Sequence, residues 1–191
     1  MSAPIVAVIG GGQLARMMQE EASALGIHLR ALVEAADGST GQVTPDAPVG
    51  AADDEAAVRA VVTGDGSDRP AGGPASVLTF EHEHQDSALL ERLQAEGVSV
   101  QPTPQALTLA RDKLAMRRKM SGAGLPQPAW AEIGGPQQES AEQMVDAIEA
   151  FAAEHGWPVV LKTPRGGYDG HGVLLVRSAE SLRQGEAADW I

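Results

Sequence analysis

Apolar residues divide the start of the chain into alternating strands and helices. The run from Ile5 to Ile9 is continuous and largely β-branched, which predicts a buried parallel strand. Three glycines at 10–12 follow it, and apolar residues then recur at helical spacing until Gly26, a residue suited to ending a helix. A second strand is predicted over 27–33. Strand, glycine turn, helix and strand in this order form a βαβ unit.

The same alternation continues to about residue 100. We expect loops over 35–54 and a surface insertion over 63–74 that is too polar and too rich in Gly and Pro to pack. The expected regular elements are a helix over 53–62, a strand over 77–80, a helix over 88–96 and a short strand over 98–100.

After residue 102 helices come first. Thr103 and Pro104 begin a predicted helix that is interrupted near Asp112 and extends to Met120. The elements expected after it are a strand over 129–133, a helix over 140–153, strands over 159–162 and 173–176, and a last helix from Ser178.

A glycine-rich loop joins the last two predicted strands. Four glycines lie within residues 166–172, and glycine lets backbone N–H groups approach an anion closely. Lys162 and Arg165 place positive charge at the base of the loop, which suits a polyphosphate. A flexible hairpin is the alternative interpretation. The Lys, Arg, Tyr and Asp residues around the glycines favour a loop that covers phosphate groups.

The first glycine turn has a second interpretation. Residues 10–15 match the G-x-G-x-x-G/A pattern, and Glu34 lies where an acidic residue would bind a ribose hydroxyl. Taken by itself, this pattern indicates an NAD(P)- or flavin-binding Rossmann oxidoreductase domain, which we retain as the alternative function. The glycines could also serve only to let the helix pack closely on the sheet.

Glu81 follows the strand predicted over 77–80. Ligands of open α/β sheets bind beyond the carboxyl ends of strands, so Glu81 is placed to meet a substrate. His82, Glu83 and His84 come next, but alternating strand residues point to opposite faces, which disfavours a shared metal site. We expect one carboxylate of this group to recognise a ligand.

Composition narrows the classes of partner. The chain has 191 residues, a formal net charge of -12 and 43% hydrophobic residues, so it can bury a core but repels nucleic-acid backbones and anionic membranes. It has no cysteine, which excludes disulfides and zinc–thiolate sites. The N-terminus lacks a basic region and a long apolar run, so we expect a cytoplasmic protein.

Four motifs occur in a characteristic order, at residues 10–17, 79–83, 111–114 and 161–172. Together they resemble the ATP-grasp ligases, and within them the 5-(carboxyamino)imidazole ribonucleotide synthase family of bacterial purine synthesis. The resemblance implies an α/β fold in which residues 1–102 form a Rossmann-like pre-ATP-grasp domain. Residues 103–191 would then be the first α+β part of an ATP-grasp domain whose second lobe is absent from the chain.

The resemblance also implies roles for particular residues. Lys113 and Lys162 match lysines that hold ATP phosphates. The other ATP-binding positions are Gly167, Tyr168, Asp169, Gly170, His171, Gly172 and Val173. Among these, the implied catalytic residues are Tyr168, Asp169 and His171, and His171 stands where the family usually has a cation. The substrate-binding residues implied are Gly12, Gln13, Leu14 and Glu81.

The reaction implied is ATP-dependent carboxylation of 5-aminoimidazole ribonucleotide by bicarbonate through carboxyphosphate. It gives 5-(carboxyamino)imidazole ribonucleotide, ADP and phosphate. ATP and Mg²⁺ are the implied cofactors, with the metal ligands expected beyond Ile191 and none in this chain. The resemblance implies a homodimer for the full-length enzyme, with no nucleic-acid or membrane partner. Without the second lobe, we expect the 191-residue chain to be inactive.

Overall fold

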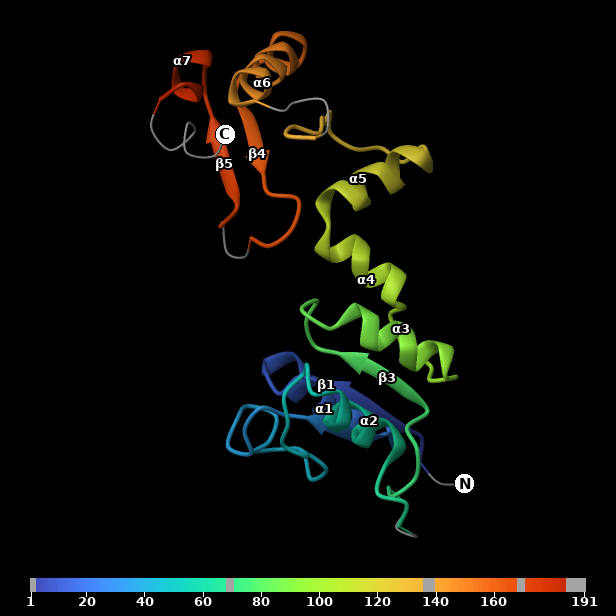
Figure 1. Cartoon of the computed structure of the whole chain (residues 1–191). Coiled ribbons are helices and arrows are strands. Elements are labelled where there is room, and N and C mark those ends of the chain that lie inside the picture. The colour runs from blue at the N-terminus through green and yellow to red at the C-terminus, as the bar shows by residue number, and fades with distance from the viewer. Residues whose placement is uncertain (1–2, 68–70, 136–139, 168–170, 185–191) are drawn as a thin grey trace. The chain divides into compact units, whose positions relative to one another are not determined.

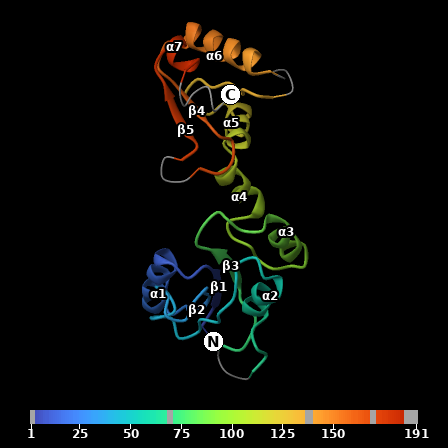
Figure 2. The same ribbon diagram turned by 60° about the vertical axis from the view of Figure 1, so that its left-hand side comes forward.

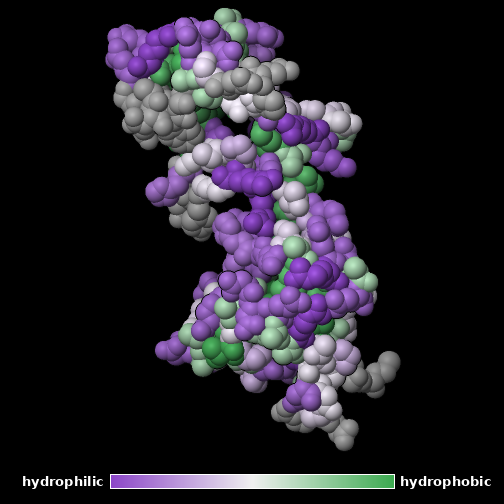
Figure 3. Space-filling view, in the orientation of Figure 1, coloured by the Kyte–Doolittle hydropathy of each residue, from purple (hydrophilic) through white to green (hydrophobic). Residues whose placement is uncertain are grey.

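Figure 1 shows the computed structural model of the chain, which describes residues 3–67, 71–135, 140–167 and 171–184. The chain divides into two compact units, Met1–Thr108 and Leu109–Ile191. In the described residues, no helix is both long enough and apolar enough to cross a membrane. Hydrophilic residues predominate over the face of the molecule in Figure 3, as the high net charge leads us to expect.

The first unit is built on a parallel sheet with strand order β2-β1-β3. The strands are β1 (Ile5–Ile9), β2 (His28–Leu32) and β3 (Val77–Phe80), and α1 (Gln13–Leu25) connects the first two. Gly26 ends α1 in the left-handed conformation with φ of 69°. The predicted βαβ unit is therefore confirmed.

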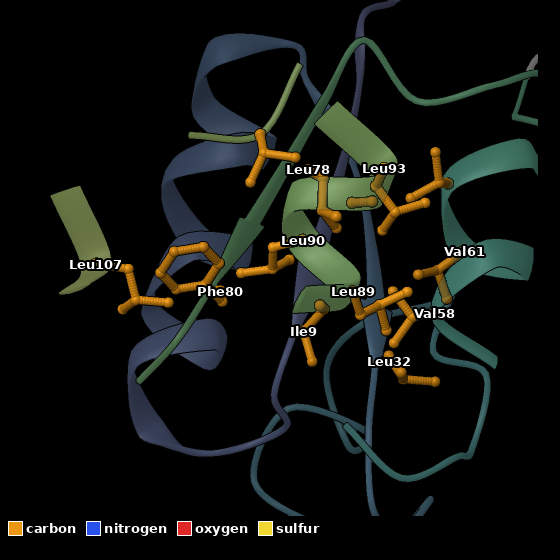
Figure 4. Close-up of a cluster of buried hydrophobic side chains, with 13 residues drawn as sticks. Ile9, Leu32, Val58, Val61, Leu78, Phe80, Leu89, Leu90, Leu93 and Leu107 are labelled. Atoms are coloured by element: carbon orange, nitrogen blue, oxygen red, sulfur yellow. The ribbon is translucent and has the colours of Figure 1, made fainter. Parts of the chain in front are cut away.

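Helices cover both faces of this sheet. Figure 2 shows α1 on one side and α2 (Glu55–Thr63) on the other, and α3 (Ser87–Ala95) packs in the same core as α2. Because successive strand residues point to opposite faces, Ile9 packs with the α2 and α3 core and Val8 packs with the α1 core. The larger of these two cores is drawn in Figure 4, where residues of all three strands meet those of α2 and α3.

The insertion at 63–74 differs from the prediction, because part of it packs against a buried charge. Arg30 of β2 is only 4% exposed. Its guanidinium donates hydrogen bonds to the carbonyls of Ala71 and Gly73, and also to the carbonyl of Val61 at 2.8 Å. A buried guanidinium has five N–H donors to satisfy, and here the acceptors are carbonyls of α2 and of the loop together with the Asp46 carboxylate, 3.1 Å from Nε.

Two predicted strands are also not formed as expected. The segment 98–100 contributes a single parallel bridge, between Val100 and Leu78, in place of a full strand. The segment 129–133 is not paired as a strand, and its Glu132 instead forms an ion pair with Arg118. In both places apolar residues contact a core without a complete ladder of backbone hydrogen bonds.

The predicted helix after residue 103 is interrupted at Asp112, as expected. The helices on either side are α4 (Pro104–Arg111) and α5 (Lys113–Gly122). The elements that follow are α6 (Ala141–His155), the antiparallel strands β4 (Val159–Lys162) and β5 (Val173–Val176), and α7 (Ala179–Leu182). One face of the two strands forms a core with α6 and α7, in which Val159, Val176 and Leu182 are buried.

Candidate functional site

The glycine turn of the first unit is shaped around the side chain of Glu81. Gly10 has φ of 121°, and a Cβ atom built on it would lie 2.8 Å from the Cβ of Glu81. A Cβ on Gly12 would overlap the Glu81 carboxylate. Glycine is therefore required here both by backbone conformation and by the close approach of a side chain.

The Glu81 carboxylate accepts hydrogen bonds from the start of α1. The N–H of Gly12 donates to Oε2 at 2.6 Å and the N–H of Leu14 donates to Oε1 at 3.1 Å. Its negative charge lies at the positive end of the helix dipole. In a dinucleotide-binding turn these N–H groups would face a pyrophosphate. Their use by a carboxylate of the same chain does not favour the oxidoreductase alternative.

The four predicted substrate-side residues lie together in the first unit. Gln13 and Leu14 begin α1 with exposed side chains, next to Gly12 and the Glu81 carboxylate. Glu34 is also beside the turn, because its Oε2 lies 3.0 Å from where a Cβ on Gly11 would be. The turn thus presents a carboxylate and exposed polar atoms at the carboxyl ends of β1 and β3.

Sequence reasoning missed the loop that supports this turn. The backbone N–H of Thr40 donates to the Gly11 carbonyl at 3.0 Å, and its hydroxyl donates to the Gly12 carbonyl at 2.7 Å. Thr40 is fully buried, and Arg16 of α1 binds the carbonyl of Ser39 at 3.0 Å. The segment 35–54 has no hydrophobic periodicity, so nothing in its pattern indicated this contact.

The histidines after β3 interact locally. The N–H of His84 lies 3.2 Å from Nδ1 of His82, and the His84 ring lies 3.6 Å from the Glu83 carboxylate. Among the residues that the structure describes, no group of three or more His, Asp or Glu side chains could hold a metal ion.

The second candidate site lies on the open face of β4 and β5. On this face Val160, Val173 and Leu175 are 49%, 43% and 44% exposed, although all three are large apolar residues. Lys162 belongs to the same face, since it pairs with Val173 across the hairpin. An exposed apolar surface beside a cation is unusual for a strand pair that serves only the core, and it is suited to an apolar ring carrying phosphate groups.

Two glycines close the base of the loop between these strands. The N–H of Thr163 donates to the Gly172 carbonyl at 3.0 Å. Gly167 and Gly172 have φ of 81° and 69°, and Cβ atoms there would overlap the His171 carbonyl and the Thr163 hydroxyl. These glycines therefore hold the ends of the loop close together.

Lys113 is bonded to this loop from α5. Its backbone N–H donates to the Pro164 carbonyl at 2.9 Å, and its ammonium donates to the Gly166 carbonyl at 3.0 Å. Asp112 caps α5 by accepting from the N–H of Ala115, and its other oxygen accepts from Arg165 at 2.9 Å. The Ala115 N–H, followed by the Arg165 guanidinium, lowers the pKa of the Asp112 carboxyl.

A cavity of about 240 Å³ lies in the second unit beside Lys162. Apolar side chains of α5, α6 and β4 line it, among them Leu114, Met144, Ile148 and Val160. Lys162 and Glu132 are the charged residues in its described lining. The cavity has the apolar walls and the few charged groups that are typical of small-molecule sites.

The structure therefore brings together two separate sets of the predicted residues. Gly12, Gln13, Leu14 and Glu81 belong to the first unit. The second unit holds Lys113, Lys162, Gly167, His171, Gly172 and Val173. Tyr168, Asp169 and Gly170 lie outside the described residues.

A Rossmann-like parallel unit, followed by a paired lysine and glycine-loop hairpin, defines an α/β protein of the ATP-grasp class. Residues 4–111 match the family described as the ribonucleotide synthetase preATP-grasp domain. The chain belongs to this family.

Comparison with similar proteins is consistent with the ATP-grasp class. The N5-carboxyaminoimidazole ribonucleotide synthase of Mycobacterium tuberculosis (strain ATCC 25618 / H37Rv) is 46% identical over 181 residues, which are 95% of this chain and 38% of the relative. A solved ADP complex of N5-carboxyaminoimidazole ribonucleotide synthetase matches 100% of this chain and 45% of its own, at 26% identity and a TM-score of 0.77.

A second solved structure, carboxyaminoimidazole ribonucleotide synthase from Aspergillus clavatus complexed with ATP, has a TM-score of 0.73 at 26% identity. The match covers 98% of this chain and 44% of the Aspergillus clavatus chain. The chain thus spans less than half the length of these proteins and corresponds to their N-terminal part. The fold is a pre-ATP-grasp domain followed by part of an ATP-grasp fold.

Proposed function

We propose that this chain supplies the ribonucleotide-binding and phosphate-binding parts of an ATP-dependent carboxylase of purine biosynthesis. The reaction joins bicarbonate, activated by ATP as carboxyphosphate, to the amine of 5-aminoimidazole ribonucleotide. The products are 5-(carboxyamino)imidazole ribonucleotide, ADP and phosphate. The observation that carries the proposal is that the ammonium of Lys113 lies on the same glycine loop that begins after Lys162.

The second unit is proposed to bind ATP. Lys113 and Lys162 would neutralise phosphate oxygens, and the N–H groups of Gly167, His171, Gly172 and Val173 would be donors from the loop. The exposed apolar side chains of β4 and β5 would contact the base of the nucleotide. Support comes from relatives of known structure that were solved with ADP and with ATP.

Charge that develops during phosphoryl transfer requires cations and backbone donors that are already in place. Lys113 would meet this requirement, because its backbone N–H is bonded to the Pro164 carbonyl and its ammonium to the Gly166 carbonyl. Tyr168, Asp169 and His171 are proposed as the catalytic residues of the loop. A closing loop would also protect carboxyphosphate from water.

The first unit is proposed to bind the ribonucleotide at Gly12, Gln13, Leu14 and Glu81. A carboxylate accepts hydrogen bonds from hydroxyl groups, so Glu81 is suited to recognising a ribose. The phosphate of the ribonucleotide would avoid this position because of the negative charge.

Further proposals concern the organisation of the whole enzyme. We place the domain boundary between residues 102 and 103, and we propose that the active enzyme is a homodimer that uses Mg²⁺. We assign the metal ligands to the part of such enzymes that this chain does not match, since the chain covers 38% of the Mycobacterium tuberculosis relative. The 191-residue chain is proposed to bind nucleotide without turnover.

The test has two stages. In the first, a fluorescent ATP analogue is titrated into this chain, into Lys162→Ala and into Lys119→Ala, which removes an exposed lysine of α5 as a control. We expect binding that ATP displaces and NADH does not, with affinity about tenfold lower in Lys162→Ala, because one charge-assisted contact is lost. Displacement by NADH at similar affinity would favour the oxidoreductase alternative.

In the second stage, consumption of 5-aminoimidazole ribonucleotide with ATP and bicarbonate is measured for the product of the complete gene. ADP release that requires the ribonucleotide and collapses in Lys162→Ala is expected. ADP release at equal rates with and without the ribonucleotide would contradict the proposed reaction.

A further inference from the structure

We propose that Asp112 is a positioning residue that fixes the base of the glycine loop against α5 and thereby places the Lys113 ammonium for phosphate binding. This inference rests on the proposed ATP site of the second unit. It assigns a positioning role to Asp112, and it assigns to Arg165 a contact within the protein in addition to the positive charge noted above at the base of the loop.

The first observation is that Asp112 divides its two carboxylate oxygens between two elements. Oδ1 accepts from the N–H of Ala115 at 2.9 Å and begins α5, while Oδ2 accepts from Arg165 Nε at 2.9 Å. The side chain of Asp112 is only 13% exposed, although Arg165 is 79% exposed. A single carboxylate therefore ties the first turn of α5 to the loop segment after β4.

The second observation is that Lys113 makes two contacts with the same loop segment. Its backbone N–H binds the Pro164 carbonyl, and its ammonium binds the Gly166 carbonyl at 3.0 Å. These acceptors lie on either side of Arg165 in the sequence. Asp112, the cap of α5, and Lys113, its first residue, thus together hold the three consecutive loop residues 164–166.

The Lys113 ammonium has enough donors to bind the loop and a phosphate at the same time. A lysine ammonium has three N–H donors, and Gly166 uses one of them. Lys113 can therefore bind a phosphate oxygen while it keeps the Gly166 carbonyl. A lysine side chain held in this way loses less conformational entropy on binding, because part of that entropy is already lost. Removal of the Asp112 to Arg165 contact should release the loop segment and with it the orientation of Lys113.

The two functions of Asp112 can be separated by substitution. Serine is also a good helix cap but carries no charge for Arg165, so Asp112→Ser retains the cap and loses the ion pair. Arg165→Gln loses the ion pair from the other side. An ion pair with so exposed an arginine contributes little to global stability, so both variants should remain folded. Arg183→Gln, which removes the ion pair to Glu149 away from the cavity lining, is the matched control.

The experiment measures affinity for the fluorescent ATP analogue and hydrogen exchange of the backbone amides of Arg165–Gly167 without nucleotide. We expect Asp112→Ser and Arg165→Gln to weaken binding about fivefold and to accelerate exchange about fivefold, with Arg183→Gln unchanged in both. Affinity and exchange as in the original chain for both variants would overturn the inference. If the original chain fails to bind the analogue, the proposed function fails, and the exchange measurement still tests whether Asp112 holds the loop.

Discussion

Glu81 provides the most direct test of how the glycine turn is stabilised. Its carboxylate accepts hydrogen bonds from Gly12 and Leu14 at the start of α1. A hydrogen bond to a charged group contributes about 1.5–3 kcal/mol when buried, and a favourable charge at a helix end contributes about 0.3–1 kcal/mol. Because the Leu14 bond is exposed and water can replace it, we expect Glu81→Ala to lower the free energy of unfolding of the first unit by about 2 kcal/mol.

The assay can report each unit separately. The three tryptophans are residues 130, 157 and 190, all in the second unit, so tryptophan fluorescence in urea follows that unit. Hydrogen exchange of the β1 amides in the same urea series follows the first unit. Glu81→Ala should shift the exchange series and leave the fluorescence transition unchanged. Glu83→Ala is the control, and equal effects of the two substitutions would refute the role of the carboxylate as a cap.

Three further predictions concern other contacts. Arg30→Met should destabilise the first unit by about 3 kcal/mol in the same exchange series, because it leaves buried carbonyls without a donor, and no loss would contradict that role. Arg59 lowers the pKa of Glu55 and Glu96 from the ordinary value of 4.5, so its stabilising effect is present above that pH and is lost as pH falls through the lowered values. In the exchange series of the first unit, the urea midpoints of Arg59→Gln and the original chain should therefore differ at neutral pH and converge as pH falls through the lowered pKa values, and a constant difference would count against this pairing. Gly172→Ala should weaken binding of the ATP analogue several-fold, because alanine is strained at φ of 69° and would overlap Thr163, and unchanged affinity would show that the loop base tolerates a side chain.

Much of the fold was predictable because it depends on short-range patterns. The βαβ unit follows from a β-branched run and a helical period, and the break at Asp112 follows from a capping residue between two helices. The predictions of full strands over 98–100 and 129–133 were wrong. Both carry apolar residues, but strand pairing requires a partner edge that sequence cannot locate.

The candidate site was predictable as a set of residue types and only partly as a set of contacts. A glycine loop after Lys162 indicated phosphate binding from charge and backbone freedom. That Lys113 would bind the Gly166 carbonyl, 53 residues away, could not be inferred from spacing. The same is true of Thr40, whose buried hydroxyl holds the first glycine turn from a loop without periodicity.

The sequence by itself determined where the helices and their caps form, because these depend on side chains within a few turns of backbone, and it located the paired strands β1 to β5. It also determined the local excess of glycine and positive charge beside Lys162 in an otherwise acidic chain. Only the tertiary structure decided which donors and acceptors meet. Glu81 closes the start of α1 from 69 residues beyond Gly12, and Arg30 is buried against carbonyls of a loop that its composition predicted to be free. Such contacts are decided when helices and loops pack on the sheet, since each buried polar group must then find a partner among the residues brought near it.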